Sequence, residues 1–194
     1  KNPDMSVLFG KAGYTEWAAE AGVPLVDLNA DESVRVPIDG RVFRSMPVAR
    51  TVVEPDQFLI GVPKLKTHNL GITSLSLKNL QGVIVPIQER HICTAGFPRY
   101  EGDRGVDLPR TTVESHERWA NKLCDIHLAV RPHLHVIDGL VGRDGSGFNS
   151  GHNHACGLAI AGANPVAVDT VASYLVGFSP EDLTYLRVAG ERGL

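Results

Sequence analysis

The sequence predicts an α/β fold with a mixed, largely parallel sheet, helices on both faces and one β-hairpin. Apolar runs at 57–63, 133–140 and 156–163 alternate with segments of helical spacing, the clearest of which is 113–130. Residues 33–45 read SVRVPIDGRVFRS, where apolar and polar residues alternate before Asp39-Gly40, a typical hairpin turn, and Val42 is expected to start the return strand.

The N-terminal half is expected to contain three further elements. Segment 6–28 has the pattern strand, helix, strand, with the helix ending at Gly22. Segment 57–63 is a continuous apolar run, which predicts a buried strand. The residues that follow suit a short helix, capped by Thr73 or Ser74 and ending at Gly82.

The C-terminal half begins with a long loop or lid over 94–112, which is rich in Gly, Pro and charge. A glycine-rich loop is expected over 142–151, and the strand at 156–163 is expected to be buried. Asn164 and Pro165 predict a helix start, because asparagine is a good N-cap and proline suits the first helical position. Ser179-Pro180 opens a last helix by the same reasoning.

Composition limits the function classes. The chain has 194 residues, 43% hydrophobic and 21% charged, which suits a single α/β domain over 1–194. A net charge of −3 argues against a nucleic-acid partner, and no apolar run is long enough to span a membrane. The first residues lack a signal-peptide pattern and the chain does not begin with Met, so we expect a fragment of a longer protein.

The cysteines indicate a reducing compartment. Cys93, Cys124 and Cys156 are odd in number and form no Cys-x-x-Cys pair, so a disulfide scaffold is not expected and a cytoplasmic location is. For the same reason we expect no intrinsic iron–sulfur cluster from this chain. The cofactor is unknown at this point, a divalent metal is left open, and a homo-oligomer is compatible with the sequence.

The stretch PKLKTHNLGITSLSLKN, residues 63–79, is the main candidate for a site. It follows a predicted strand, and ligands of α/β sheets bind where strands end. Lys64 and Lys66 are two apart and would face one side of an extended chain, making an anion cradle with Thr67. His68 is a candidate proton-transfer group. A solvated surface run of lysines is the alternative.

Two further strand ends could complete this site, and Lys78 and Asn79 lie about a helical turn beyond Thr73 and Ser74. Asp138 ends one predicted strand and could bind a cation or orient a lysine. Gly145 and Gly147 in the loop after it would let the backbone approach a ligand, although a flexible connection explains them equally well. Asp169 lies among apolar residues, so it is either on an exposed face or paired. In the second case it points back toward the lysines and, like Asp138, would orient them or bind a cation.

Three histidines are candidate metal ligands. His152 and His154 are two apart in GHNH and could bind a metal from a loop, and His91 could close over the site.

The motifs PKLKTHNLGITSLSLKNLQGVIVP, ERH, VIDGLVGRDGSGFNSG and AGANPVAVDTVASYLVGF resemble the domain of unknown function 362 family, over residues 10–194. Members of that family are often labelled iron–sulfur-centre proteins, and many carry an additional segment with Cys-x-x-Cys motifs, which this chain lacks. The family pattern Gly-x-Gly-Pro is Gly145-Ser146-Gly147-Phe148 here.

The spacing of His68 and Lys78 is also similar to a stretch in nickel-pincer lactate racemases. There a catalytic histidine precedes a lysine that holds the pincer cofactor. The resemblance implies a proton-transfer role for His68 and a cofactor or substrate anchor in Lys78. It offers no match for the racemases' second catalytic histidine.

The leading hypothesis is a small-molecule enzyme that binds an anionic substrate, a carboxylate or a phosphate. His68 and Lys78 would be catalytic, and Lys64 and Lys66 would hold the anion. The alternative is a non-enzymatic module, either a redox accessory that docks a ferredoxin-like partner or a domain that binds a metabolite without turnover.

Overall fold

The computed structural model describes residues 4–90, 112–147 and 150–194. A five-stranded sheet forms its centre, built from β3 (Ile60–Gly61), β4 (Lys64–His68), β5 (Ile72–Thr73), β6 (Leu134–Arg143) and β7 (Asn153–Gly162). β3 and β4 run parallel to β6, whereas β5 pairs antiparallel with β4 and β7 antiparallel with β6. The mixed α/β fold expected from the sequence is therefore confirmed.

The strand directions decide which loops can meet. β4 and β6 are parallel, so their carboxyl ends lie at the same edge of the sheet, near the pair Lys66 and Arg143. β7 is antiparallel to β6, and its last residue, Gly162, pairs with His135 near the start of β6. The junction after β7 therefore lies at the opposite edge, away from the other two strand ends.

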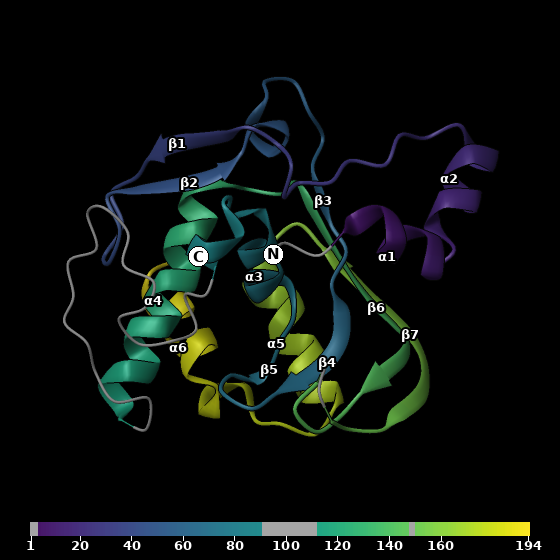
Figure 1. The fold of residues 1–194 in the computed structure, drawn as a ribbon. Coiled ribbons are helices and arrows are strands. Elements are labelled where there is room, and N and C mark those ends of the chain that lie inside the picture. The colour runs from purple at the N-terminus through teal and green to yellow at the C-terminus, as the bar shows by residue number, and fades with distance from the viewer. Residues whose placement is uncertain (1–3, 91–111, 148–149) are drawn as a thin grey trace.

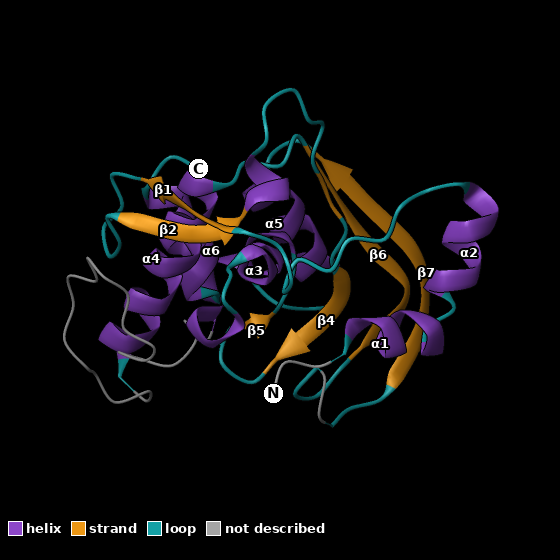
Figure 2. Ribbon diagram, turned by 45° about the horizontal axis from the view of Figure 1, so that its top comes forward, coloured by secondary structure: helices purple, strands orange, loops and turns teal. Residues whose placement is uncertain are grey.

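The helices lie on both sides of the sheet, as Figures 1 and 2 show. On one side are α3 (Ser76–Asn79), α4 (Val113–Ala129), α5 (Pro165–Leu175) and α6 (Thr184–Glu191). On the other are α1 (Met5–Lys11) and α2 (Tyr14–Ala21), of which only Ala18 is buried. Short 3₁₀ turns connect the elements: η1 (Arg50–Val53), η2 (Leu80–Val83), η3 (Ile87–Arg90) and η4 (Pro180–Asp182).

Two apolar clusters hold the layers together. The larger one joins α4, α6 and the second strand of the hairpin, with Leu123, Leu186 and Met46 at most 5% exposed. The smaller one lies beneath β4, between the sheet and α5; it consists of Leu65, Leu75, Ile137, Val168 and Ala172. β4 thus rests on a packed apolar base, which fixes the side chains on its other face.

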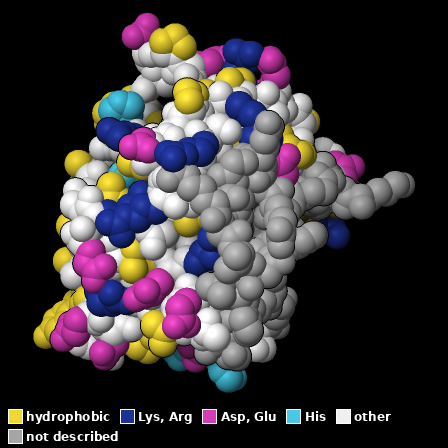
Figure 3. Space-filling view, turned by 90° about the vertical axis from the view of Figure 1, so that its left-hand side faces the viewer, with side chains coloured by type: hydrophobic (Ala, Val, Ile, Leu, Met, Phe, Trp, Pro, Cys, Tyr) yellow, Lys and Arg dark blue, Asp and Glu magenta, His cyan; other side chains and the backbone are white. Residues whose placement is uncertain are grey.

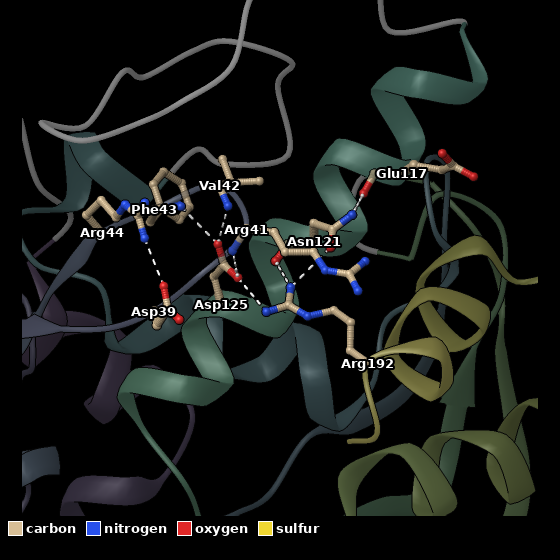
Figure 4. A network of polar contacts seen from close by, with 9 residues as sticks. All are labelled: Asp39, Arg41, Val42, Phe43, Arg44, Glu117, Asn121, Asp125 and Arg192. Atoms are coloured by element: carbon tan, nitrogen blue, oxygen red, sulfur yellow. Dashed lines mark hydrogen bonds and ion pairs between the residues drawn. The ribbon is translucent and has the colours of Figure 1, made fainter.

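The hairpin is confirmed, but its turn is longer than the sequence indicates. β1 (Ser33–Pro37) pairs antiparallel with β2 (Ser45–Ala49), so the prediction that Val42 starts the return strand is wrong. The reason is a carboxylate from α4: Asp125 accepts the backbone N–H groups of Arg41, Val42 and Phe43 at 3.0, 2.8 and 2.9 Å (Figure 4). These bonds hold the turn against the core.

Three other predicted elements are corrected. Segment 6–28 contains two helices and no strand, because Asp4 caps α1 and Val23–Leu28 pairs with no described strand. The run 57–63 is a strand only at Ile60–Gly61, and Phe58, which stacks on the ring of His133, is 68% exposed. β7 was expected to be buried but is largely exposed: among the described strands it pairs with β6 alone, and of its side chains Leu158 and Ile160 pack against the smaller apolar cluster.

Two predicted helices are confirmed. Residues at helical spacing on α4, among them Trp119, Leu123 and Ile126, are buried against the core. α5 begins as expected, with the Asn164 side chain accepting the N–H of Ala167 at 2.9 Å and proline at the first helical position. The predicted last helix is split into η4 and α6.

The loop or lid expected over 94–112 lies outside the described residues except for Thr112. Its side chain caps α4 by accepting the N–H of Ser115 at 3.1 Å. Within the part of the chain that is described, no helix combines the length and apolarity needed to cross a bilayer.

Candidate functional site

A cavity of about 390 Å³ lies where β4 ends and the chain turns through β5 into α3. Lys64, Lys66 and His68 alternate along β4 and reach the cavity together, because side chains two apart on a strand share a face. α3 contributes Lys78 and Asn79. The full lining is Pro63, Lys64, Lys66, His68, Ser74, Leu75, Lys78, Asn79, Gln81, Gly82 and Arg90.

The two lysines of β4 differ in their partners. Lys64 Nζ donates to Asp138 Oδ2 at 2.8 Å, and this bond, followed by the N–H of Leu140, lowers the pKa of Asp138. The sequence predicts Asp138 at the end of a strand, but the residue lies within β6. Lys66 makes no hydrogen bond or ion pair with a described residue. Burial, and then the charge of Lys78, lower the pKa of Lys66 from 10.5 to about 8.

The backbone fixes the tautomer of His68. Its Nδ1 accepts the N–H groups of Leu70 at 3.0 Å and Gly71 at 3.3 Å. A ring nitrogen that accepts N–H groups carries no proton, so the proton of the neutral ring is on Nε2. Burial, and then the charges of Lys78 and Lys66, lower the pKa of His68 to about 4. At neutral pH the ring is therefore uncharged, with its proton on Nε2.

A strained turn holds the backbone against His68. The N–H of Thr73 donates to the carbonyl of Gly71 at 2.6 Å, and Ile72 between them has a φ of 62°. This is the rare type of γ-turn, and a positive φ is unusual for a β-branched residue. A Cβ at Gly71 would overlap the ring of Trp119, which stacks on His68 with ring centroids 6.4 Å apart. The strained turn at Ile72 thus adjoins the backbone N–H groups of Leu70 and Gly71, whose hydrogen bonds to Nδ1 set the tautomer of His68.

Lys78 is held from the following turn. Its Nζ donates to Gln81 Oε1 at 3.2 Å, and Gln81 Nε2 donates to the carbonyl of Arg90. The guanidinium of Arg90 in turn donates to the carbonyl of Ile84 at 3.2 and 3.0 Å. The sequence analysis missed both Gln81 and Arg90. The spacing of Gln81, three residues after Lys78 on a helical face, was a signal that could have identified it.

Asp169 is buried beneath α3 and is not among the cavity's lining residues. It accepts the N–H groups of Ser76 at 2.7 Å and Leu77 at 3.1 Å, and thus caps α3 from α5. This corrects the predicted cap at Thr73 or Ser74. Burial raises the pKa of Asp169 to about 7, although the two N–H bonds oppose the shift.

The glycine-rich loop packs on the other side of β4. Thr67 Oγ1 donates to the carbonyl of Gly145 at 2.7 Å, and Gly147, with a φ of 84°, lies so close that a Cβ there would overlap the Thr67 carbonyl. Neither glycine lines the first cavity. A second cavity of about 280 Å³ lies between this loop and β4; its lining is Leu65, Lys66, Thr67, Gly142, Arg143, Asp144, His154, Cys156, Val176 and Phe178. Lys66 lines both cavities.

Two of the three candidate metal ligands lie by this loop. His154 Nε2 lies 2.9 Å from Asp144 Oδ2, and His152 Nδ1 lies 3.8 Å from Asp144 Oδ1. Within the described residues, no group of three or more His, Cys, Asp or Glu side chains is arranged to hold a metal ion. His91 lies outside the described residues, so its role stays a prediction.

Charge on the molecular surface is mixed. On the face shown in Figure 3, Lys and Arg side chains are interspersed with Asp and Glu over the described residues. The positive charge around the first cavity is therefore a local feature of a chain whose net charge is −3.

The comparisons with known proteins place the chain among uncharacterised relatives. A family model described as domain of unknown function (DUF362) matches residues 1–174. The thylakoid-associated protein sll1697 of Synechocystis sp. is 22% identical over 184 residues, which are 94% of this chain and 50% of that protein. The chain thus spans about half the length of the curated relative it matches. No solved structure matches.

Proposed function

The chain belongs to the DUF362 family, and we propose that its cavity at the end of β4 binds a small carboxylate or phosphate anion. One observation carries the proposal: Lys64, Lys66, Lys78 and Arg90 all line the cavity, and among the described residues that line it none is acidic. Asp138 reaches Lys64 from outside this lining. An anion would therefore meet several donors, and no carboxylate from the described lining residues, in a space suited to a small molecule.

The electrostatics support the same reading. The lowered pKa of Lys66 means that the folded chain disfavours a further positive charge there, because water is partly excluded and Lys78 repels it. A bound anion would reverse this preference and raise the pKa of Lys66. Binding should therefore be coupled to proton uptake near pH 8.

His68 fits this function as a hydrogen-bond donor. Its Nδ1 is taken by two backbone N–H groups and Nε2 carries the proton, so the neutral ring has no lone pair for a ligand's proton. This favours donation to an anionic or carbonyl oxygen over the proton-acceptor role expected from the sequence. The racemase-like role of His68 and Lys78, and docking of a ferredoxin-like partner, stay predictions.

Isothermal titration calorimetry with inorganic phosphate and with pyruvate tests the proposal. Replacing Lys66 or Lys78 by alanine removes a charged donor, which should weaken binding roughly tenfold to a hundredfold. Lys11→Ala removes the same charge at the exposed end of α1 and should leave binding unchanged. Equal affinities for the wild type and the two cavity variants would contradict the proposal.

A further inference from the structure

Lys66 differs from the other amine of β4 in ways that bear on reactivity. Lys64 is paired with the carboxylate of Asp138 at 2.8 Å and is about two-fifths exposed. Lys66 is partly buried and has no such partner among the described residues. It lies between the two cavities, which places its amine within reach of molecules in either.

The loop over Lys66 leaves room for its amine. A Cβ built at Gly147 would lie 3.6 Å from Lys66 Nζ, which is an ordinary van der Waals distance, so the loop at Gly147 lies beside the amine without overlapping it. The nearest carboxylate of this loop, Asp144, is engaged by the backbone N–H of His152 at 2.5 Å and by His154 Nε2 at 2.9 Å. The other Lys, Arg, Asp and Glu residues that are described in the linings of the two cavities are basic, namely Lys64, Lys78, Arg90 and Arg143.

The protonation of Lys66 suits a nucleophile. Because its pKa is about 8, roughly half of the amine is uncharged at pH 8. Lysines that react with carbonyl groups are activated in this way, by a desolvated site or a neighbouring cation, and both causes act here.

We propose that Lys66 forms a Schiff base with a small carbonyl compound that carries an anionic group, such as a 2-oxo acid. The inference rests on the proposed anion site, because Lys78 and its neighbours would hold the anionic group while the amine meets the carbonyl. The lone pair of the uncharged Nζ forms a bond to the carbonyl carbon while the C–O π bond breaks, and one proton passes from Nζ to the carbonyl oxygen to give a carbinolamine. The C–O bond then breaks as Nζ gives up its second proton, so that the oxygen leaves as water and a C=N bond to Nζ remains.

His68 and Lys64 have separate parts in this scheme. The Nε2–H of His68 is a donor in the same cavity and can stabilise the oxygen as it gains charge. Lys64, paired with Asp138, is an internal control two residues away on the same strand.

Reductive trapping tests the inference. The chain is incubated with pyruvate and sodium cyanoborohydride at pH 8, digested, and mapped by mass spectrometry. Lys66 should gain the mass of pyruvic acid less one oxygen, at least about tenfold faster than Lys64. Pyridoxal 5′-phosphate in place of pyruvate shows whether a phosphate serves as well as a carboxylate. Equal labelling of Lys64 and Lys66 with both probes would overturn the inference.

A charge-conserving variant separates this inference from the anion site. Lys66→Arg keeps a cation but removes the nucleophile, so trapping at position 66 should vanish while calorimetry still detects anion binding. Wild-type chain that binds pyruvate without trapping it would refute the Schiff base and leave the anion site standing. Trapping of uncharged acetone at the same rate as pyruvate would instead refute the anion's part.

Discussion

Two polar regions of the molecule contrast in how their charges are satisfied. Around Asp125, a fully buried carboxylate accepts three backbone N–H groups and a bond from Arg192 at 2.7 Å, and Arg192 itself is nearly buried (Figure 4). Around Lys66, cationic groups gather with no acidic group in the cavity lining among the described residues. The first region is complete without a ligand and holds the fold together. In the second region, burial and the charge of Lys78 lower the pKa of Lys66, and shifted pKa values of this kind are typical of functional sites.

Removing the centre of the complete region should have the largest effect. Asp125→Ala leaves Arg192 and three N–H groups without their acceptor, so we expect the free energy of unfolding to fall by about 3–5 kcal/mol. Urea denaturation followed by circular dichroism measures it. Asp39→Ala removes the carboxylate of an exposed pair with Arg44 and should change little. A similar fall in the free energy of unfolding of the two variants would contradict the central structural role of Asp125.

The pH dependence of the free energy of unfolding should reveal the lowered pKa of His68. Its folded pKa of about 4 lies below the ordinary 6.5, so folding favours the neutral ring. The contribution is therefore fully present above pH 6.5 and is lost as the pH falls toward 4, by up to about 3 kcal/mol. Subtracting the unfolding free energies of His68→Gln from those of the wild type isolates it from other titrating groups. A difference that is constant from pH 7 to pH 4 would contradict the assignment.

Replacing Lys66 and Lys64 of β4 by methionine should change the free energy of unfolding in opposite directions. Lys66→Met removes a partly desolvated cation that has no ion-pair partner among the described residues, so at pH 7 the free energy of unfolding should rise by about 1 kcal/mol. Lys64→Met removes a paired cation and should lower it slightly. Thermal denaturation of both variants provides the comparison. Destabilisation of the same size in both variants would mean that the folded chain already stabilises the charge of Lys66.

The features that could be predicted from the sequence are those that depend on residues close together along the chain. The alternation of Lys64, Lys66 and His68 is local, and it correctly indicates side chains on one face of a strand. The N-cap Asn164 is local as well. Asp125 could not be foreseen as the group that holds the hairpin turn, because 84 residues separate it from Arg41.

The partners of Asp169 are also distant along the chain and could not be predicted from the sequence. Its sequence environment indicated a carboxylate that must be paired, but not that its partners would be the N–H groups of α3. The tautomer of His68 depends on a γ-turn around Ile72, a conformation that β-branched residues rarely adopt. Local preferences argue against that turn, so only the folded chain reveals it.

The pKa of the Lys66 amine tests the central claim most directly, because it reports the charge balance of the cavity itself. It can be measured by NMR of ¹³C-labelled lysine Cε, first in the free chain and then with saturating inorganic phosphate or pyruvate. We predict a value of about 8 in the free chain and a clear rise when the anion is bound. An ordinary value near 10.5 in the free chain, or a value that neither anion changes, would contradict the account.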